Sequence, residues 1–265
     1  MTTMAYDKIL LTRDNGLATL TFNAPDRLNA VSRKMIAEIK TCWEELAADA
    51  SVRAVMITGA GRGFCAGADL ADPDREASAT ADSGSALDKY FNPVIRLMRT
   101  IPKPIVAAVN GVAAGVGMSF ALASDIAIAG KSASFLQAFA RIGLLPDGGS
   151  TWFLPRLVGD QRARALAMLA PQIPADKAKE WGLIWDVVDD ASLMAAATEI
   201  ARKFADGPTM ALARIKGALA QSSANDLSAQ LDVERDYQRE LGRSDDFKEG
   251  VAAFLAKRMP EFKGK

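Results

Sequence analysis

The sequence contains no histidine and only two cysteines, Cys42 and Cys65, among its 265 residues. Without histidine, neither a Ser-His-Asp triad nor a Cys-His pair can form, and the commonest metal ligand is missing. Two cysteines suit a reducing compartment and provide neither a disulfide framework nor a zinc site. We therefore predict a cytoplasmic location, no metal, and acid–base chemistry that falls to Asp, Glu, Lys, Tyr, Cys or water.

Long apolar runs, an excess of one charge and nucleotide-binding motifs are also missing. No apolar run is long enough to span a bilayer, and residues 1–10 lack the basic and then apolar segments of a signal peptide. Lys and Arg number 32 against 32 Asp and Glu, so no basic surface for nucleic acid is expected. Neither a GxGxxG fingerprint nor a GxxxxGK(S/T) phosphate loop occurs. We therefore expect no membrane and no nucleic acid as partner.

The order of the expected elements favours an α/β fold. Strands are predicted for residues 6–12, 17–22, 52–58, 105–109, 125–129, 134–139 and 183–188. Helices are predicted for residues 32–48, 87–98, 150–157, 161–170 and 174–181, and later ones begin at Pro208, Asn225 and Ser244. We therefore predict a core over residues 1–200 and a C-terminal helical region over residues 201–265.

Two glycine-rich segments carry the strongest chemical signal. The buried strand predicted at residues 105–109 is followed by Gly115 and Gly117 and then by an apolar helix. Unpaired N–H groups at a helix N-terminus can stabilise a developing negative charge, and glycine lets a ligand approach the backbone closely. Residues 59–70 form the second segment. From these segments alone, tight packing of a helix on a sheet explains the small residues equally well.

Five motifs follow one another along almost the whole chain. They are NAPDRLNA (23–30), GRGFCAGADL (61–70), PKPIVAAVNGVAAGVG (102–117), LLPDGGSTW (144–152) and DFKEGVAAFLAKR (246–258). In this order they resemble the enoyl-CoA hydratase/isomerase, or crotonase, superfamily. The resemblance implies a crotonase-like spiral of ββα units with a C-terminal helical trimerisation region. It also implies an acyl-CoA substrate, no cofactor beyond the coenzyme A of that substrate, and a homotrimer or dimer of trimers.

The resemblance also assigns an oxyanion hole. The backbone N–H groups of Ala68 and Val116 match the family's two donors, which hold the thioester oxygen while the neighbouring carbon loses a proton. Loss of one such donor typically costs roughly 2.7–4 kcal/mol of transition-state stabilisation.

Further positions match the family's substrate path. Arg27, Leu28, Ala66, Asp69 and Leu70 are expected along the adenine and pantetheine groups, Gly115 and Gly117 beside the thioester, and Phe139 and Leu144 around the acyl group. On the last predicted helix, Phe254 and Lys257 match residues that reach a neighbouring subunit's coenzyme A. Without the resemblance, Phe254 is as readily a core residue, and a helix lysine is most often simply solvated.

Departures from the family pattern indicate which reaction to expect. Family hydratases use two glutamates to activate water, and the matching residues here are Ser119 and Phe139. Neither can act as a base at neutral pH, so simple hydration is not expected. Asp147 remains in the LLPDGG loop, near which family isomerases carry a carboxylate that shuttles a proton, and desolvation would raise its pKa. The alternative is that Asp147 caps the helix starting near Gly149.

Several rival functions stay open at this stage. A 2-enoyl-CoA hydratase would add water by another group, a 4-halobenzoyl-CoA dehalogenase would release halide, and a hydrolase would release coenzyme A. A non-catalytic acyl-CoA-binding homologue would bind tightly without turnover. Cys65 has no base to make it a nucleophile. Residues 72–85, which are small and polar, are expected to form a surface loop, either a lid or a plain insertion.

Overall fold

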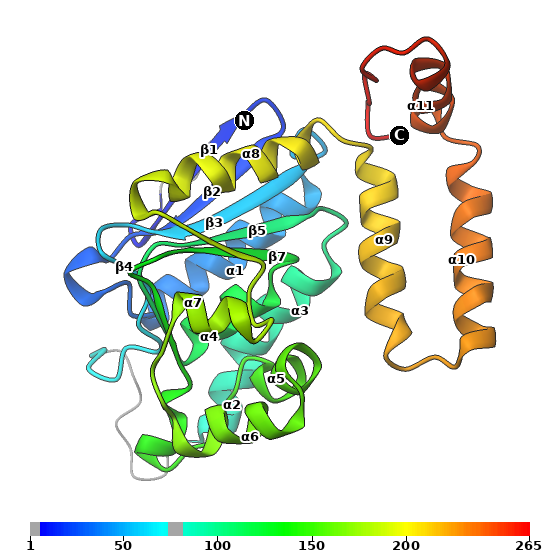
Figure 1. Ribbon diagram of the computed structural model, residues 1–265. Coiled ribbons are helices and arrows are strands. Elements are labelled where there is room, and N and C mark those ends of the chain that lie inside the picture. Colours follow the sequence, from blue (N-terminus) through cyan, green and yellow to red (C-terminus); the bar gives the residue numbers. More distant parts are fainter. Residues whose placement is uncertain (1–5, 74–81) are drawn as a thin grey trace.

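The computed structural model describes residues 6–73 and 82–265, which form two β-sheets surrounded by helices (Figure 1). In spatial order, the six-stranded sheet contains β1 (Ile9–Asp14), β2 (Leu17–Phe22), β3 (Ala54–Gly59), β5 (Ile105–Val109), β7 (Ile126–Gly130) and β10 (Asp186–Val188). The four-stranded sheet contains β4 (Gly63–Cys65), β6 (Val112–Ala114), β8 (Ser134–Leu136) and β9 (Ile173–Pro174).

Three successive pairs of strands follow the same path through these sheets. The first strands, β3, β5 and β7, pair in parallel in the larger sheet. The strand after each of them, β4, β6 or β8, pairs in parallel in the smaller sheet. Helices α3 (Asn92–Thr100), α4 (Val116–Ala123) and α5 (Ser150–Val158) follow the three pairs. This arrangement confirms the α/β class and the predicted spiral of ββα units.

The N-terminal hairpin and the first helix follow their local sequence signals. Asn15 and Gly16 join β1 to β2 with φ of 42° and 81°, the left-handed backbone that tight hairpin turns require. Helix α1 (Arg33–Ala48) begins after Ser32, whose hydroxyl accepts a hydrogen bond from the Met35 N–H. Both elements were predicted, although β1 begins three residues later than expected.

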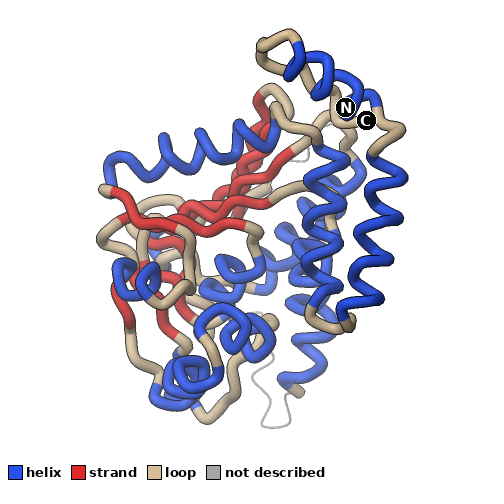
Figure 2. The backbone as a smooth tube through the Cα atoms, turned by 45° about the vertical axis from the view of Figure 1, so that its right-hand side comes forward, coloured by secondary structure: helices blue, strands red, loops and turns tan. Residues whose placement is uncertain are grey.

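The larger sheet is covered on both faces because its side chains alternate between two apolar clusters. Met56, Val106 and Ile128 face α8 (Leu193–Ala205), which contributes small and apolar residues at every fourth position. Their neighbours Ile57, Ala107 and Ala129 belong to the cluster that includes α1 and α3. Figure 1 places α8 on one side of the strands and α1 and α3 on the other, and Figure 2 shows the strands between these helical layers.

Short elements differ most from the sequence predictions. Strands β4 and β6 were not predicted, and β8 ends at Leu136, before a 3-10 turn over Ala138–Ile142. The helix expected at residues 87–98 is instead α2 (Ser83–Ala86), a π-helical turn (Leu87–Phe91) and α3. A three-residue strand is held by partners far away in the chain, so its own sequence carries almost no pattern.

The remaining helices complete the core and extend beyond it. Helices α6 (Asp160–Leu169) and α7 (Ala175–Glu180) precede β10, and 3-10 turns occupy Pro25–Arg27 and Asp190–Ser192. Helices α9 (Thr209–Ser222), α10 (Leu227–Leu241) and α11 (Asp245–Leu255) lie to one side of the sheets (Figure 1). The division at residue 200 stays a prediction, and α8 runs across it. Among the described residues, no helix is long and apolar enough to cross a bilayer.

A buried lysine fixes α9 to the core. Lys216 Nζ donates to the main-chain oxygens of Met98 and Lys103 at 2.8 and 3.2 Å and lies 2.9 Å from Asp125 Oδ2. Burial lowers the pKa of Lys216, and the Asp125 carboxylate opposes that shift. Because the ammonium group has three protons, all three contacts can be satisfied at once.

Candidate active site

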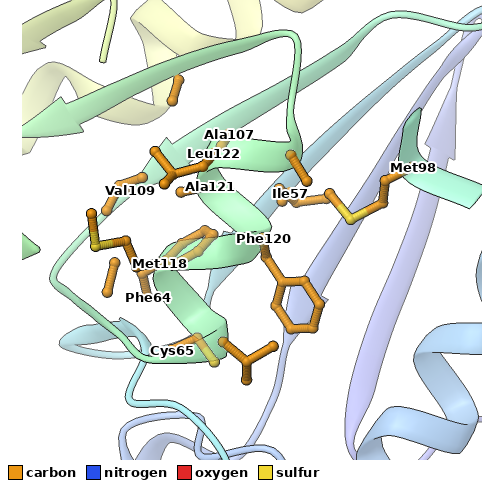
Figure 3. Packing of buried hydrophobic residues seen from close by; sticks show 14 of the residues in the cluster. Ile57, Phe64, Cys65, Met98, Ala107, Val109, Met118, Phe120, Ala121 and Leu122 are labelled. Carbon is orange, nitrogen blue, oxygen red and sulfur yellow. The ribbon is translucent and has the colours of Figure 1, made fainter. Parts of the chain in front are cut away.

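Helix α4 begins the site and is buried over all eight of its residues (Figure 3). A β-carbon at Gly117 would lie 2.1 Å from the carbonyl oxygen of Cys65, so only glycine lets α4 approach β4 this closely. The Cys65 side chain is fully buried, and desolvation raises the pKa of its thiol to about 12. Cys65 therefore offers no accessible thiolate, in line with the expectation that it is not a nucleophile.

The two expected oxyanion donors each follow a glycine with left-handed backbone. Gly67 has φ of 100° and Gly115 has φ of 51°. A β-carbon on Gly67 would lie 3.8 Å from the Gly115 Cα, so the two loops touch. Val116 is the first residue of α4, and its N–H has no partner within the helix.

The Ala68 N–H points away from Val31, the residue with which Ala68 forms a parallel β-bridge. The Val31 N–H donates to the Gly67 carbonyl at 2.7 Å, and the Asp69 N–H donates to the Val31 carbonyl at 3.0 Å. In this parallel bridge Val31 bonds to the residues on either side of Ala68, so the N–H of Ala68 itself points the other way. Both donor residues line one cavity of about 230 Å³.

The cavity brings together nine of the fourteen expected site residues. They are Ala66, Ala68, Asp69, Leu70, Gly115, Val116, Phe139, Leu144 and Asp147. The other five, which do not line it, are Arg27, Leu28, Gly117, Phe254 and Lys257. The residues contributed by the two glycine-rich loops and the Asp147 loop therefore share one space.

Sequence reasoning missed one wall of this cavity. The start of α1 and the π-helical turn contribute Val31, Ser32, Arg33, Ile36, Leu87 and Phe91. Ser32 and Ile36 lie in the helix predicted for residues 32–48, and that prediction rested on local pattern alone. The available signal was position: this helix starts three residues after the NAPDRLNA motif, in which Arg27 and Leu28 were expected along the substrate path.

Asp147 supplies a desolvated carboxylate to the cavity. Its side chain is half-buried, and within residues 6–73 and 82–265 its buried Oδ1 has no hydrogen-bond partner. Desolvation raises the pKa of Asp147 to about 6. The N-cap of α5 is Gly149, with φ of 82° and no side-chain cap bond, so the alternative of Asp147 as a helix cap is wrong. The carboxylate therefore has no capping role and can contact a ligand in the cavity.

Ser119 and Phe139 occupy the two positions that the sequence comparison matched to the glutamates of family hydratases. Ser119 is fully buried, and its hydroxyl lies 3.0 Å from the main-chain oxygen of Asp147. A β-carbon at Gly148, which has φ of 58°, would lie 2.8 Å from the Ser119 β-carbon, so only glycine at position 148 lets the Asp147 loop approach Ser119 this closely. Phe139 is 8% exposed, and its ring packs beside Gly115. Neither position supplies a base.

Arg27 and Leu28 do not line the cavity, but they connect the NAPDRLNA motif to the GRGFCAGADL motif. Arg27 Nη2 lies 2.6 Å from Asp69 Oδ1. The Leu28 carbonyl accepts a hydrogen bond from the Ala66 N–H at 2.9 Å. Asp69 and Ala66 line the cavity, so these contacts tie the NAPDRLNA loop to its rim.

Phe254 and Lys257 lie outside the cavity described above. Phe254 is 82% exposed on α11, and Lys257, expected on the same helix, lies two residues beyond its end with φ of 53°. Neither lines the cavity of its own chain. Of the expected loop at residues 72–85, residues 74–81 lie outside the described residues, and Asp72 and Asp82 line the cavity.

Comparison with known proteins gives consistent matches over almost the full chain. A family model described as enoyl-CoA hydratase/isomerase matches residues 12–265. A 1,2-epoxyphenylacetyl-CoA isomerase of Escherichia coli (strain K12) is 49% identical over 253 residues, covering 95% of this chain and 97% of that protein. A Rhodobacter capsulatus protein named "Probable enoyl-CoA hydratase" is 42% identical over 262 residues, covering 99% of this chain and 100% of that protein.

A solved structure has the same fold. The crystal structure of an enoyl-CoA hydratase from Bacillus anthracis matches with a TM-score of 0.91 at 31% sequence identity, covering 98% of this chain and 100% of that chain. The names of the relatives include both an isomerase and a hydratase, so similarity alone does not choose between the two reactions.

Proposed function

The chain belongs to the enoyl-CoA hydratase/isomerase family, and on that basis we propose that it is an acyl-CoA isomerase with Asp147 as its proton shuttle. The observation that carries the proposal is the buried Oδ1 of Asp147, which has no hydrogen-bond partner among the described residues and shares a cavity with Ala68 and Val116. A carboxylate with a pKa near 6 is largely ionised at neutral pH and still accepts and returns a proton readily. Hydration is disfavoured because Ser119 and Phe139 supply no base.

The proposed mechanism consists of moving one proton within the substrate through an enolate intermediate. The N–H groups of Ala68 and Val116 bind the thioester oxygen and stabilise the negative charge that develops there. Asp147 takes the proton from the carbon next to the thioester and returns it to a carbon further along the acyl group. The product is an isomer of unchanged mass, so no co-reactant is required and no cofactor is proposed beyond the coenzyme A of the substrate.

We propose two substrates that share this chemistry. The first is ring-1,2-epoxyphenylacetyl-CoA, whose enolate opens the epoxide and rearranges to the seven-membered oxepin-CoA, a step of phenylacetate breakdown. The likeness to the Escherichia coli isomerase supports it. The second is a 3-enoyl-CoA, which becomes the conjugated 2-enoyl-CoA when the proton moves from the α-carbon to the γ-carbon.

Product analysis by mass and absorbance tests the proposal. The purified protein is mixed separately with ring-1,2-epoxyphenylacetyl-CoA, a 3-enoyl-CoA and a 2-enoyl-CoA. We expect isomers of unchanged mass from either or both of the first two and no added water on the third. Hydration of the 2-enoyl-CoA as the main reaction would contradict the proposal and favour a hydratase. Release of free coenzyme A, or of halide from a 4-halobenzoyl-CoA, would indicate a hydrolase or a dehalogenase.

We further propose a homotrimer or a dimer of trimers assembled through the C-terminal helices. Large apolar side chains that are more than half exposed support this, and they come from α9, α10 and α11: Ile215, Leu219, Leu227, Leu231, Phe247, Phe254 and Leu255. In such an assembly Phe254 and Lys257 would contact a neighbour's coenzyme A. Light scattering of the purified protein measures the mass, and a monomer would contradict this assembly. A cytoplasmic location is proposed from the two free cysteines.

A further inference from the structure

Buried polar side chains link the loop of Asp147 to the helix that carries Val116. Gln137, Ser150 and Ser119 are each fully buried and come from the turn after β8, the first residue of α5 and the fourth residue of α4. Gln137 Nε2 lies 2.9 Å from Ser150 Oγ, which lies 2.8 Å from Ser119 Oγ. Ser119 Oγ lies 3.0 Å from the Asp147 main-chain oxygen. These three side chains are called the Gln137–Ser150–Ser119 network below.

The donors and acceptors of the network allow a continuous chain of hydrogen bonds. The Gln137 amide donates to the Ser150 hydroxyl, and the Ser119 hydroxyl has the Asp147 carbonyl as its nearer main-chain acceptor; when Ser119 donates there, the Ser150 proton is the one shared with Ser119. In that arrangement each hydroxyl accepts one bond and donates one. The Ser150 N–H also donates to the Asp147 carbonyl at 3.0 Å, so two bonds hold the peptide that joins Asp147 to Gly148. Hydrogen bonds in such chains strengthen one another in a low-dielectric interior.

At its other end, Ser119 lies against the peptide of an oxyanion donor. The Ser119 N–H donates to the Gly115 carbonyl at 3.2 Å, and Ser119 Oγ lies 3.3 Å from the same oxygen. The Gly115 carbonyl and the Val116 N–H belong to one planar peptide unit. Ser119 therefore contacts both the peptide that presents the oxyanion donor and the peptide that presents the base.

We propose that the Gln137–Ser150–Ser119 network positions the Asp147 carboxylate relative to the Val116 N–H. Ser119 is then a positioning residue for Asp147, at the place where family hydratases have a catalytic glutamate. The inference rests on the proposed function, because it concerns the base assigned there. A base and an oxyanion hole must be held within about 0.5 Å of their productive geometry. Two bonds to the Asp147 carbonyl oppose the peptide rotation that would turn the carboxylate out of the cavity.

Gln137 indicates that the network does more than support folding. Its buried Oε1 has no hydrogen-bond partner in the described part of the chain. An unpaired buried acceptor destabilises the fold, so an apolar side chain of similar size would serve stability at least as well. We expect Gln137→Met to keep or raise the melting temperature while it loosens the Asp147 loop.

The test compares Ser119→Ala, Gln137→Met and Asp147→Asn with the control Ser124→Ala. Ser124 is buried at the end of α4, and its hydroxyl donates to the Phe120 carbonyl at 3.1 Å, so the control loses a similar bond away from Asp147. Isomerisation of 3-hexenoyl-CoA gives kcat and KM, and thermal unfolding gives the melting temperature. We expect Ser119→Ala and Gln137→Met to lower kcat about tenfold with KM within about twofold, and Ser124→Ala to match the wild type.

The pH profile of kcat/KM provides a readout that a purely structural role would not move. A loosened carboxylate gains water and loses the desolvation that raises its pKa, so we expect the acid limb to shift to lower pH in Ser119→Ala and Gln137→Met. Wild-type kcat and pH profile in both variants, with Asp147→Asn inactive, would overturn the network's role and leave the proposed function standing.

Other outcomes separate the two proposals further. Full turnover by Asp147→Asn, or no isomerisation by the wild type, would contradict the proposed function and the network's role together. Losses of activity that follow lowered melting temperatures in every variant, the control included, would assign the network a structural role only and overturn the positioning proposal.

Discussion

At the scale of single residues, the central feature is a carboxylate kept away from water. The pKa of Asp147 is raised to about 6 by desolvation. The other charged groups that line its cavity are Arg33 from α1, Asp69 and Asp72 from the loop after β4, and Asp82 before α2. Desolvation is the cause of the shift, so the pKa of Asp147 depends on how well the loop excludes water from the carboxylate and not on a nearby charged side chain.

The pH dependence of turnover follows from this pKa. Asp147 must be ionised to accept a proton, so kcat/KM for isomerisation should fall about tenfold per pH unit below pH 6 and level off above it. Steady-state assays between pH 5 and 8 measure the profile, with intrinsic fluorescence to confirm that the protein stays folded. A flat profile over this range would exclude Asp147 as the base that limits the rate.

Asp147→Asn should stabilise the protein at neutral pH. The folded-state pKa is higher than the ordinary value of 3.8, so the folded protein binds the proton more tightly than the unfolded chain. Stability therefore falls as the pH rises from about 4 to about 6, and the ionised carboxylate destabilises the fold above that range. After a discount for its partial exposure, we expect Asp147→Asn to raise the free energy of unfolding at pH 8 by about 1 to 2 kcal/mol.

Urea unfolding of both proteins at pH 8 and pH 4 checks this sign. At pH 4 the wild-type carboxyl is protonated when folded, so the two proteins should be equally stable. A variant that is less stable than the wild type at pH 8 would show that Asp147 supports the fold and that its carboxylate is not strained by burial.

At the scale of elements, the close approach of α4 to β4 positions the Val116 N–H of the proposed oxyanion hole. A β-carbon at Gly117 would meet the Cys65 carbonyl oxygen at 2.1 Å, and both atoms belong to the backbone. Gly117→Ala should therefore lower the free energy of unfolding by about 3 kcal/mol and displace the adjacent Val116 N–H, which would reduce kcat.

Gly250→Ala is the matched control for this prediction. Gly250 lies inside α11, and its nearest neighbour to an added β-carbon is the Phe262 ring at 3.5 Å. Alanine should stabilise this helix by up to about 1 kcal/mol and leave kcat unchanged. A Gly117→Ala protein as stable and active as Gly250→Ala would contradict the packing account of α4.

Elements with strong local patterns could be predicted, and those that depend on distant partners could not. β5 and the start of α1 after Ser32 match their predictions because a buried apolar run and a helix cap are local signals. β6 has three residues and pairs with β4 and β8, so nothing in its own sequence identifies it. The two glycine loops were found from their own sequence, and the roles of Ala68, Val116 and Asp147 through the family motifs. The wall of α1 and the π-helical turn was missed because local patterns identify a helix but not the cavity against which it packs.

At the scale of the whole molecule, Lys216 connects the C-terminal helices to the core. Lys216→Met would remove three contacts and leave Asp125 with the Arg99 guanidinium at 3.6 Å and the Ile105 N–H at 2.8 Å. Breaking a buried ion pair from one side is costly, so we expect the free energy of unfolding to fall by about 3 kcal/mol. Limited proteolysis should also cleave near Thr209 sooner than in the wild type.

Lys203→Met is the control for losing a lysine charge at an exposed position instead of a buried one. Lys203 pairs with Glu199 on the surface of α8, and both side chains are about 70% exposed. Its loss should change the free energy of unfolding by no more than about 0.5 kcal/mol. Equal effects of the two substitutions would show that Lys216 does not hold α9 on the core.

The most direct measurement of the central claim is exchange of the α-protons of phenylacetyl-CoA in heavy water. This thioester has acidic α-protons and no epoxide, so it isolates proton transfer between the α-carbon and Asp147 from the later rearrangement. Mass spectrometry follows the incorporation of deuterium with the wild type and with Asp147→Asn. The account predicts exchange by the wild type and a loss of at least about 100-fold in the variant. Equal exchange by both proteins would show that Asp147 does not move the proton.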